Sequence, residues 1–151
     1  MVRSRTAHTL VELIIVVLIL AALTFIAVPR LNFATLYGKQ AHTIAKRIVT
    51  DLRRTRTIAI SNAATNPTGY RLRMVGSAPY ASYQILNDAN GATVDSQAIE
   101  SPISCTGGSQ FTFGPLGNLK TGGDAQLTIS SGGKTYTITI IPATGIVECT
   151  Q

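Results

Sequence analysis

The residue types that most often perform chemistry are scarce in this chain. Its 151 residues include two histidines and two cysteines, so a zinc site would use almost all of both. The sequence also lacks the serine motif of α/β hydrolases, a phosphate-binding loop and any local signature that pairs cysteine with histidine. We therefore expect no metal, no cofactor and no enzymatic activity. The side chain that stands out instead is Glu12, the one charged residue between positions 10 and 28.

The sequence around Glu12 is the most apolar part of the chain. Residues 13–28 are interrupted only by Thr24, and residues 8–29 approach the ~20 apolar residues with which a helix crosses a bilayer. Residues 1–7 contain two arginines and no acid, which places the N-terminus in the cytoplasm by the positive-inside rule. A cleaved secretory signal would be shorter and would end in small residues. A plain membrane anchor would gain nothing from Glu12, unless that acid stays wet at the lipid boundary.

The start of the chain resembles the class III signal of type IV pilins and pseudopilins. In that family a basic leader ends in a small residue, a prepilin peptidase cuts before an apolar helix, and the fifth mature residue is glutamate. A cut between Ala7 and His8 makes Glu12 the fifth mature residue and puts Pro29 where many members carry a proline that loosens the helix. The sequence departs from the family at Ala7, where glycine is usual, and at His8, where phenylalanine is usual. The resemblance also implies N-methylation of His8.

The resemblance gives Glu12 a role in assembly. Cleavage creates a new amine on His8, and in filaments of this family the apolar helices stack in the centre. A carboxylate buried there needs a cation within hydrogen-bonding distance, which the amine of a neighbouring subunit supplies. Because one stagger of the helices brings the two charges together, the pair would also set the axial register.

After Pro29 the helical period continues, but the helix becomes amphipathic. Asn62 and the Asn66-Pro67 pair provide its stop signals. We expect one helix over about residues 8–62, apolar in its first half and kinked or loosened at Pro29. The apolar face of the second half consists of residues spaced three and four apart: Phe33, Tyr37, Ala41, Ile44, Ile48, Leu52 and Thr55.

Residues 68–151 alternate with a period of two, which is typical of half-buried strands. We expect hairpin turns at Asn90-Gly91 and at Gly132-Gly133. The predicted strands are residues 71–75, 83–86, 126–130, 136–140 and 145–149. The sequence thus predicts an α+β fold of pilin type, in which a long N-terminal α-helix, transmembrane in its first half and amphipathic in its second, packs on a C-terminal antiparallel β-sheet domain. Its parts would be a leader (1–7), a transmembrane assembly helix (8–29), an amphipathic helix (30–62) and the β domain (63–151).

Three further segments resemble the H-type minor pseudopilins of type II secretion. These are the helix end at residues 51–60, the segment Phe-Thr-Phe-Gly-Pro-Leu-Gly at 111–117, and Gly-Ile-Val at 145–147. We expect Phe111 and Phe113 to be core residues. The resemblance implies a structural subunit of a type II secretion pseudopilus or of a type IV pilus. The alternatives are a minor pilin that binds DNA or a secreted substrate, and a major type IV pilin.

The partners that this resemblance implies are other pilin or pseudopilin subunits, the prepilin peptidase and an assembly platform in the inner membrane. The resemblance places the protein in the bacterial inner membrane, with its globular domain in the periplasm, and then in a periplasmic pseudopilus or a surface filament.

Positive charge is concentrated near the N-terminus, since nine of the 13 lysines and arginines lie within residues 1–56. Four arginines, Arg53, Arg56, Arg71 and Arg73, form a possible weak patch for anions or nucleic acid. A solvated helix face or a contact between subunits is the alternative for the first two. Some minor pilins bind DNA through a basic C-terminal tail, but residues 147–151 contain no lysine or arginine.

Cys105 and Cys149 lie in the domain that we place outside the cytoplasm, where thiols are oxidised. We expect a disulfide between them, which would tie the last strand to the body of the domain. Pilins often have such a C-terminal disulfide, although H-type pseudopilins usually do not. Two free, buried thiols are the alternative.

Overall fold

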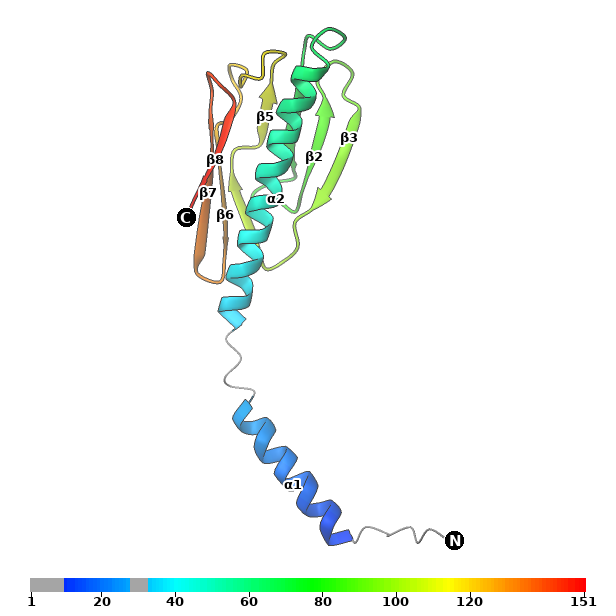
Figure 1. The fold of residues 1–151 in the computed structure, drawn as a ribbon, viewed down its shortest axis with the longest axis vertical. Coiled ribbons are helices and arrows are strands. Elements are labelled where there is room, and N and C mark those ends of the chain that lie inside the picture. Colours follow the sequence, from blue (N-terminus) through cyan, green and yellow to red (C-terminus); the bar gives the residue numbers. More distant parts are fainter. Residues whose placement is uncertain (1–9, 28–32) are drawn as a thin grey trace, which may run out of the picture. The chain divides into compact units, whose positions relative to one another are not determined.

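The computed structural model describes residues 10–27 and 33–151, with the side chains of a few helix-end residues left out (Figure 1). The chain divides into two compact units, Met1–Phe33 and Ala34–Gln151. Helix α1 (Leu10–Ala27) is the described part of the first unit. Helix α2 (Phe33–Ser61) and eight strands make up the second, apart from the first residue of α2. Ala7, His8 and Pro29, which carry predictions about cleavage, methylation and the helix junction, lie outside the described residues.

Helix α1 is apolar on every side. Apart from Glu12 and Thr24, its 18 residues are all hydrophobic, so no polar face alternates with an apolar one. The Thr24 hydroxyl donates to the backbone oxygen of Ala21 at 2.8 Å, which satisfies it within the helix. Within the described ranges, neither helix combines the length and the apolar character that crossing a membrane would require.

Helix α2 is amphipathic, as its spacing of apolar residues predicts. Thr55 is fully buried on the apolar face of the helix. Its hydroxyl is satisfied there because it donates to the Asp51 backbone oxygen at 2.6 Å. The helix ends where Asn62 begins a turn, and the Asn66 amide donates to the Asn62 oxygen at 2.7 Å. The buried apolar face consists of Ala41, Ala45, Ile48, Val49, Leu52 and Ala59.

The strands form two four-stranded sheets, and every strand pairs antiparallel with its neighbours. The first sheet has the order β3-β2-β1-β5 and the second the order β4-β6-β7-β8. The strands of the first are β1 (Tyr70–Val75), β2 (Ser82–Asn87), β3 (Thr93–Ala98) and β5 (Gln110–Phe113). Those of the second are β4 (Ser104–Gly107), β6 (Gln126–Ser131), β7 (Lys134–Ile141) and β8 (Ile146–Thr150).

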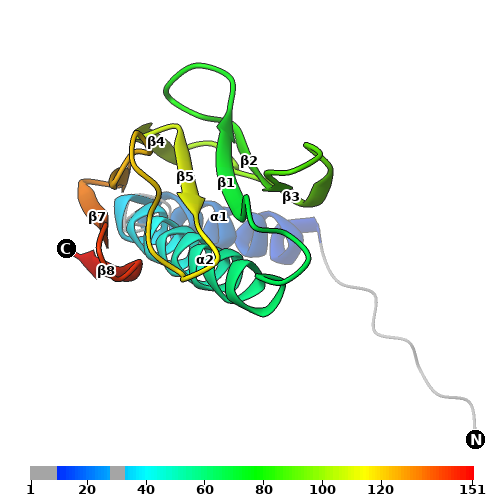
Figure 2. The same ribbon diagram turned by 90° about the horizontal axis from the view of Figure 1, so that it is seen from above.

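The hydrophobic core lies between α2 and both sheets. Figures 1 and 2 show α2 running along one face of the sheets. Leu72 of β1, Phe111 of β5 and Ile138 of β7 are each at most 1% exposed and belong to one cluster with the buried face of α2. The second unit is therefore a single body in which one helix covers two sheets. The expectation that Phe111 and Phe113 are core residues is confirmed.

The turn between β6 and β7 is the predicted two-residue hairpin. Gly132 and Gly133 have φ angles of 57° and 75°, a left-handed pair that glycine adopts without strain. The hairpin expected at Asn90-Gly91 also exists between β2 and β3, but residues 88–92 form its connection, which makes it longer than predicted. The five predicted strands correspond to β1, β2, β6, β7 and β8.

The predicted fold class is wrong in two respects. The expected single long helix, transmembrane in its first half, is instead two helices, α1 and α2, that belong to different units. Pro29 falls between them in the sequence, and a proline lacks the backbone donor that a continuous helix needs. The expected single sheet is two sheets, because β4 pairs with β6 and β5 pairs with β1 rather than with each other.

Candidate functional site

Most of the large hydrophobic side chains that are exposed among the described residues lie on α1. Its large side chains range from Val16, 50% exposed, to Phe25, 86% exposed. Exposed apolar side chains that surround a helix cost free energy in water, and a helix that is apolar all round is normally buried. Contiguous apolar surface of this kind marks a site of association.

Glu12 lies in the first turn of α1. A carboxylate at this position is stabilised by the unsatisfied N–H groups and the positive end of the helix dipole. It also interrupts an apolar surface with one charge, which gives that surface a single position at which a cationic partner is favoured. The structure thus places the one acid of the apolar segment at its N-terminal end.

Two of the predicted basic residues, Arg53 and Arg56, hold backbone segments against the second half of α2. The Arg53 Nη2 donates to the Val147 backbone oxygen of β8 at 3.0 Å. The Arg56 Nε donates to the backbone oxygens of Gly117, at 3.0 Å, and of Thr144, at 3.2 Å. Both guanidinium groups therefore have structural partners within the unit.

The other two predicted basic residues, Arg71 and Arg73, lie on a different face. Tyr70, Leu72 and Met74 of β1 are buried in the core with α2, so Arg71 and Arg73, which alternate with them, face away from α2. The Arg71 Nε lies 2.8 Å from Asp88 Oδ1, and Arg73 is exposed. The prediction of a single patch of four arginines is therefore wrong, because the sheet separates one pair from the other.

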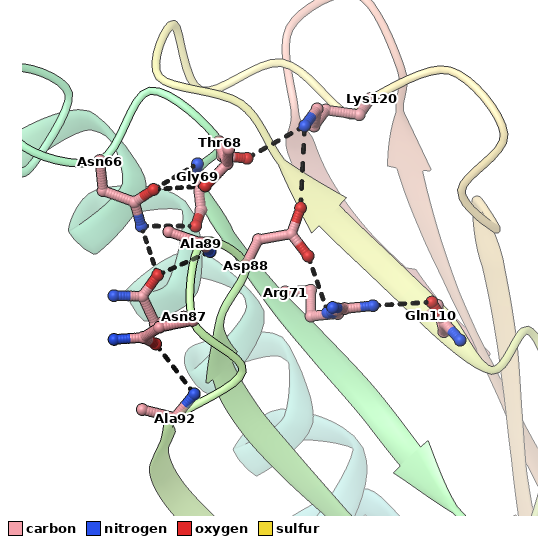
Figure 3. A network of polar contacts seen from close by, with 11 residues as sticks. Asn66, Thr68, Gly69, Arg71, Asn87, Asp88, Ala89, Ala92, Gln110 and Lys120 are labelled. Atoms are coloured by element: carbon pink, nitrogen blue, oxygen red, sulfur yellow. Dashed lines mark hydrogen bonds and ion pairs between the residues drawn. The ribbon is translucent and has the colours of Figure 1, made fainter.

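Arg71 belongs to a polar network that the sequence did not reveal (Figure 3). One oxygen of Asp88 forms an ion pair with Arg71 Nε, and the other lies 3.7 Å from the Lys120 Nζ, which donates to the Thr68 backbone oxygen at 3.1 Å. A polar depression of about 220 Å³ is open beside these groups. Arg71 and Lys120 both pair with Asp88. These contacts join β1, the turn after β2 and the segment after β5. The network contains no arrangement of a nucleophile and a base.

Asn66 is the buried centre of this network. Its side-chain nitrogen donates to Gly69 O at 2.7 Å and to Asn87 Oδ1 at 2.8 Å. Its side-chain oxygen accepts from the Thr68 hydroxyl at 2.6 Å and from the Gly69 amide at 3.1 Å. The sequence marks Asn66 only as a helix stop. The signal for its wider role is the run Asn-Pro-Thr-Gly, in which an asparagine side chain closes the turn that follows it.

Between α2 and the first sheet, a second set of polar contacts surrounds Tyr83 of β2. Its hydroxyl donates to Asp51 Oδ2 at 2.6 Å. Burial, and then the bond to Asp51, raise the pKa of Tyr83 well above its usual value. The outer strand β3 is held to the helix through the Arg54–Asp95 ion pair at 2.5 Å and an Arg47–Gln97 hydrogen bond. The Arg54 guanidinium lowers the pKa of Asp95.

Cys105 and Cys149 are both free, so the predicted disulfide is wrong. Cys105 is buried in β4 and Cys149 is exposed in β8, the two outer strands of the second sheet. Three strand spacings separate β4 from β8, about 14 Å, whereas a disulfide needs Cα atoms within about 7 Å. Burial raises the pKa of the Cys105 thiol to about 12. Partial burial also raises the pKa of the Cys149 thiol.

Among residues 10–27 and 33–151, no group of three or more histidine, cysteine, aspartate or glutamate side chains is arranged to hold a metal ion. Comparison of the chain with protein-family models, curated proteins and solved structures found no match.

Proposed function

We propose that the protein is a structural subunit of a pilin-like filament, either a type II secretion pseudopilus or a type IV pilus. It would be made as a precursor, cut between Ala7 and His8 by a prepilin peptidase, and assembled by a platform in the inner membrane into a periplasmic or surface filament. The observation that carries the proposal is α1, a helix with apolar side chains exposed on every side and one acid in its first turn. The residues before it support the proposal through their resemblance to a prepilin signal.

In the proposed assembly, the α1 helices of neighbouring copies cover one another. Burying a leucine or isoleucine side chain contributes about 1.5–3 kcal/mol, and α1 exposes many of them. Such packing is strong but does not specify a stagger, because α1 is apolar at nearly every position. A salt bridge between Glu12 of one copy and the His8 amine of another would specify it, since a buried acid without a cation is strongly disfavoured.

The second unit is suited to a position on the outside of such a filament. The apolar face of its one helix is already covered by two sheets. Four of its arginines are engaged with backbone oxygens or carboxylates: Arg53, Arg54, Arg56 and Arg71. These pairings leave little support for the alternative of a DNA-binding minor pilin. A major and a minor subunit differ in abundance, so their share of the protein in sheared filaments distinguishes them.

The test combines N-terminal sequencing with an assembly assay on the full chain. We expect sheared filaments to contain a chain that begins at His8. Glu12→Gln keeps the shape of the side chain but removes its charge, and we expect it to be cut normally and to be lost from filaments. The control is Glu148→Gln, which removes an exposed acid of the second unit. Filaments whose subunits still begin at Met1, or normal assembly of Glu12→Gln, would contradict the proposal.

A further inference from the structure

An exposed leucine lies in a turn beside the C-terminal end of α2. Leu116, which is 87% exposed, lies in the turn formed by residues 114–118, here called the Leu116 turn. The Gly114 amide donates to the Asn118 oxygen and the Gly117 amide donates to the Gly114 oxygen, both at 2.9 Å. These bonds, and the Arg56 guanidinium on the Gly117 oxygen, fix the turn, so Leu116 is held out on an ordered support.

The Leu116 turn lies beside the last residues of α2. Gly117 has a φ of 79°, and a Cβ on it would lie 2.6 Å from the Ile60 side chain. Glycine is therefore required there by both conformation and space. The turn contains no charged residue, so it can enter an apolar site without burying a charge.

An apolar groove lies near the other end of α2. It has a volume of about 480 Å³ between the first turns of the helix and the segment that joins β3 to β4. Leu36, Ile44 and Ile103 provide its apolar lining, and Lys39 and Glu100 lie beside them. Sites that enclose small ligands measure roughly 300–1,000 Å³, so this Ile44 groove has room for one large side chain.

The turn and the groove of one copy are too far apart to meet. Sixteen residues of α2 separate Ile44 from Ile60, which corresponds to about 24 Å along the helix. An apolar projection and an apolar groove at opposite ends of one body give a heterologous contact, which continues from copy to copy in a filament whose rotation does not close a ring. We propose that the Leu116 turn of one copy inserts into the Ile44 groove of the next copy, as a second contact along the filament.

The partner is therefore a second copy of this chain, and the contact is head to tail. Lys39 and Glu100 beside the groove carry opposite charges, so the uncharged turn meets no net repulsion there. The inference deepens the proposed function by adding a contact between globular units. It does not depend on Glu12 or on cleavage after Ala7.

Disulfide trapping in the full-length chain tests this contact. The variant carries Leu116→Cys and Thr43→Cys, of which Thr43 lines the groove, in a Cys149→Ser background that removes the exposed native thiol. Because each copy then has one cysteine in the turn and one in the groove, oxidation should give a ladder of dimers, trimers and longer species. Each single-cysteine variant should stop at dimers. The matched control combines Leu116→Cys with Ser77→Cys, an exposed position outside the groove, and should give no ladder.

A second measurement uses the native side chain. Burial of a leucine implies that Leu116→Ala weakens association between copies roughly tenfold to a hundredfold. Val94→Ala, which shortens another exposed apolar side chain, should not change it. Competition sedimentation of the two variants against wild type measures the difference.

The outcomes separate this inference from the proposed function. Filaments that form normally but give no ladder, or give it equally with the Ser77→Cys control, would overturn the head-to-tail contact alone. A ladder in the Glu12→Gln variant, which is expected to form no filaments, would support the contact independently. A further variant combines Thr43→Cys with Leu18→Cys of α1 and keeps Leu116. A cross-link between these two cysteines would show that α1 occupies the groove, and would also overturn the inference.

Discussion

Replacing Asn66 with alanine removes the buried centre of the polar network in the second unit. Four hydrogen bonds are lost, two donated by the side-chain nitrogen and two accepted by the side-chain oxygen. Gly69 keeps other partners, because its amide also donates to the Asn66 backbone oxygen and its oxygen also accepts from Asp88. The penalty for unsatisfied groups is therefore small. At the low end of about 0.5–1.5 kcal/mol for each bond, we expect a loss of about 2–3 kcal/mol.

This loss is a large share of the roughly 5–15 kcal/mol by which a domain is stable. Urea unfolding followed by tyrosine fluorescence measures it in the full chain, because all five tyrosines lie in the second unit. Asn90→Ala is the matched control. Asn90 is exposed and its side chain accepts one bond, from the Ala92 amide at 2.9 Å, so we expect a loss of about 0.5 kcal/mol or less.

Asn66→Asp sharpens the test. At neutral pH a carboxylate would face Gly69 O and Asn87 Oδ1, to which the native side chain donates, so this variant should be at least as unstable as Asn66→Ala. Losses for Asn66→Ala and Asn66→Asp that do not exceed the loss for Asn90→Ala would refute the assignment of Asn66 as the centre of the network.

Three further results are expected. Gly145→Ala should destabilise the second unit strongly, since a Cβ there would lie 1.9 Å from a backbone oxygen and the φ is 65°; Gly133→Ala, at a similar φ but in open space, is the control in urea unfolding. Because the pKa of Tyr83 is raised in the folded state, its contribution is complete below the unfolded pKa of about 10 and is lost as the pH rises further; unfolding between pH 9 and 12 should show a smaller loss for Tyr83→Phe than for wild type. Iodoacetamide should label Cys149 in the native protein and label Cys105 only after unfolding, as mass spectrometry would detect, and native labelling of Cys105 would contradict its burial.

Much of the second sheet can be predicted from the sequence because local patterns determine it. Alternating apolar residues mark β6 and β7 as strands with one buried face, and the two glycines between them specify the hairpin. The register pairs Leu127 with Ile138 and Ile129 with Tyr136, as the shared face predicts. In these elements, the burial pattern and the turn chemistry agree.

The missed strands lack that pattern. Strand β3 is mostly exposed, contains few apolar residues and is attached to α2 by polar side chains, so no alternation reveals it. Strand β4 has only four residues. Strand order is also absent from local sequence, which is why the positions of the two cysteines at opposite edges could not be foreseen.

Of the candidate site, the sequence predicts the apolar character of α1 and the position of Glu12 within it. It did not predict the separation of the arginines, because this depends on which face of the first sheet α2 covers. Alternation along β1 indicates that Arg71 and Leu72 face opposite ways, but the position of the helix is a tertiary property.

The hydrogen bonds that Arg53 and Arg56 donate affect which amino-acid substitutions this molecule tolerates. Both arginines hold backbone oxygens rather than side chains, at Val147, Gly117 and Thr144. Every amino acid presents that same oxygen, so most substitutions in the anchored segments leave the attachment intact. The side chains of the turns that contain Gly117 and Thr144 can therefore be replaced while the backbone of these turns keeps its position, provided that glycine is kept where the backbone requires it.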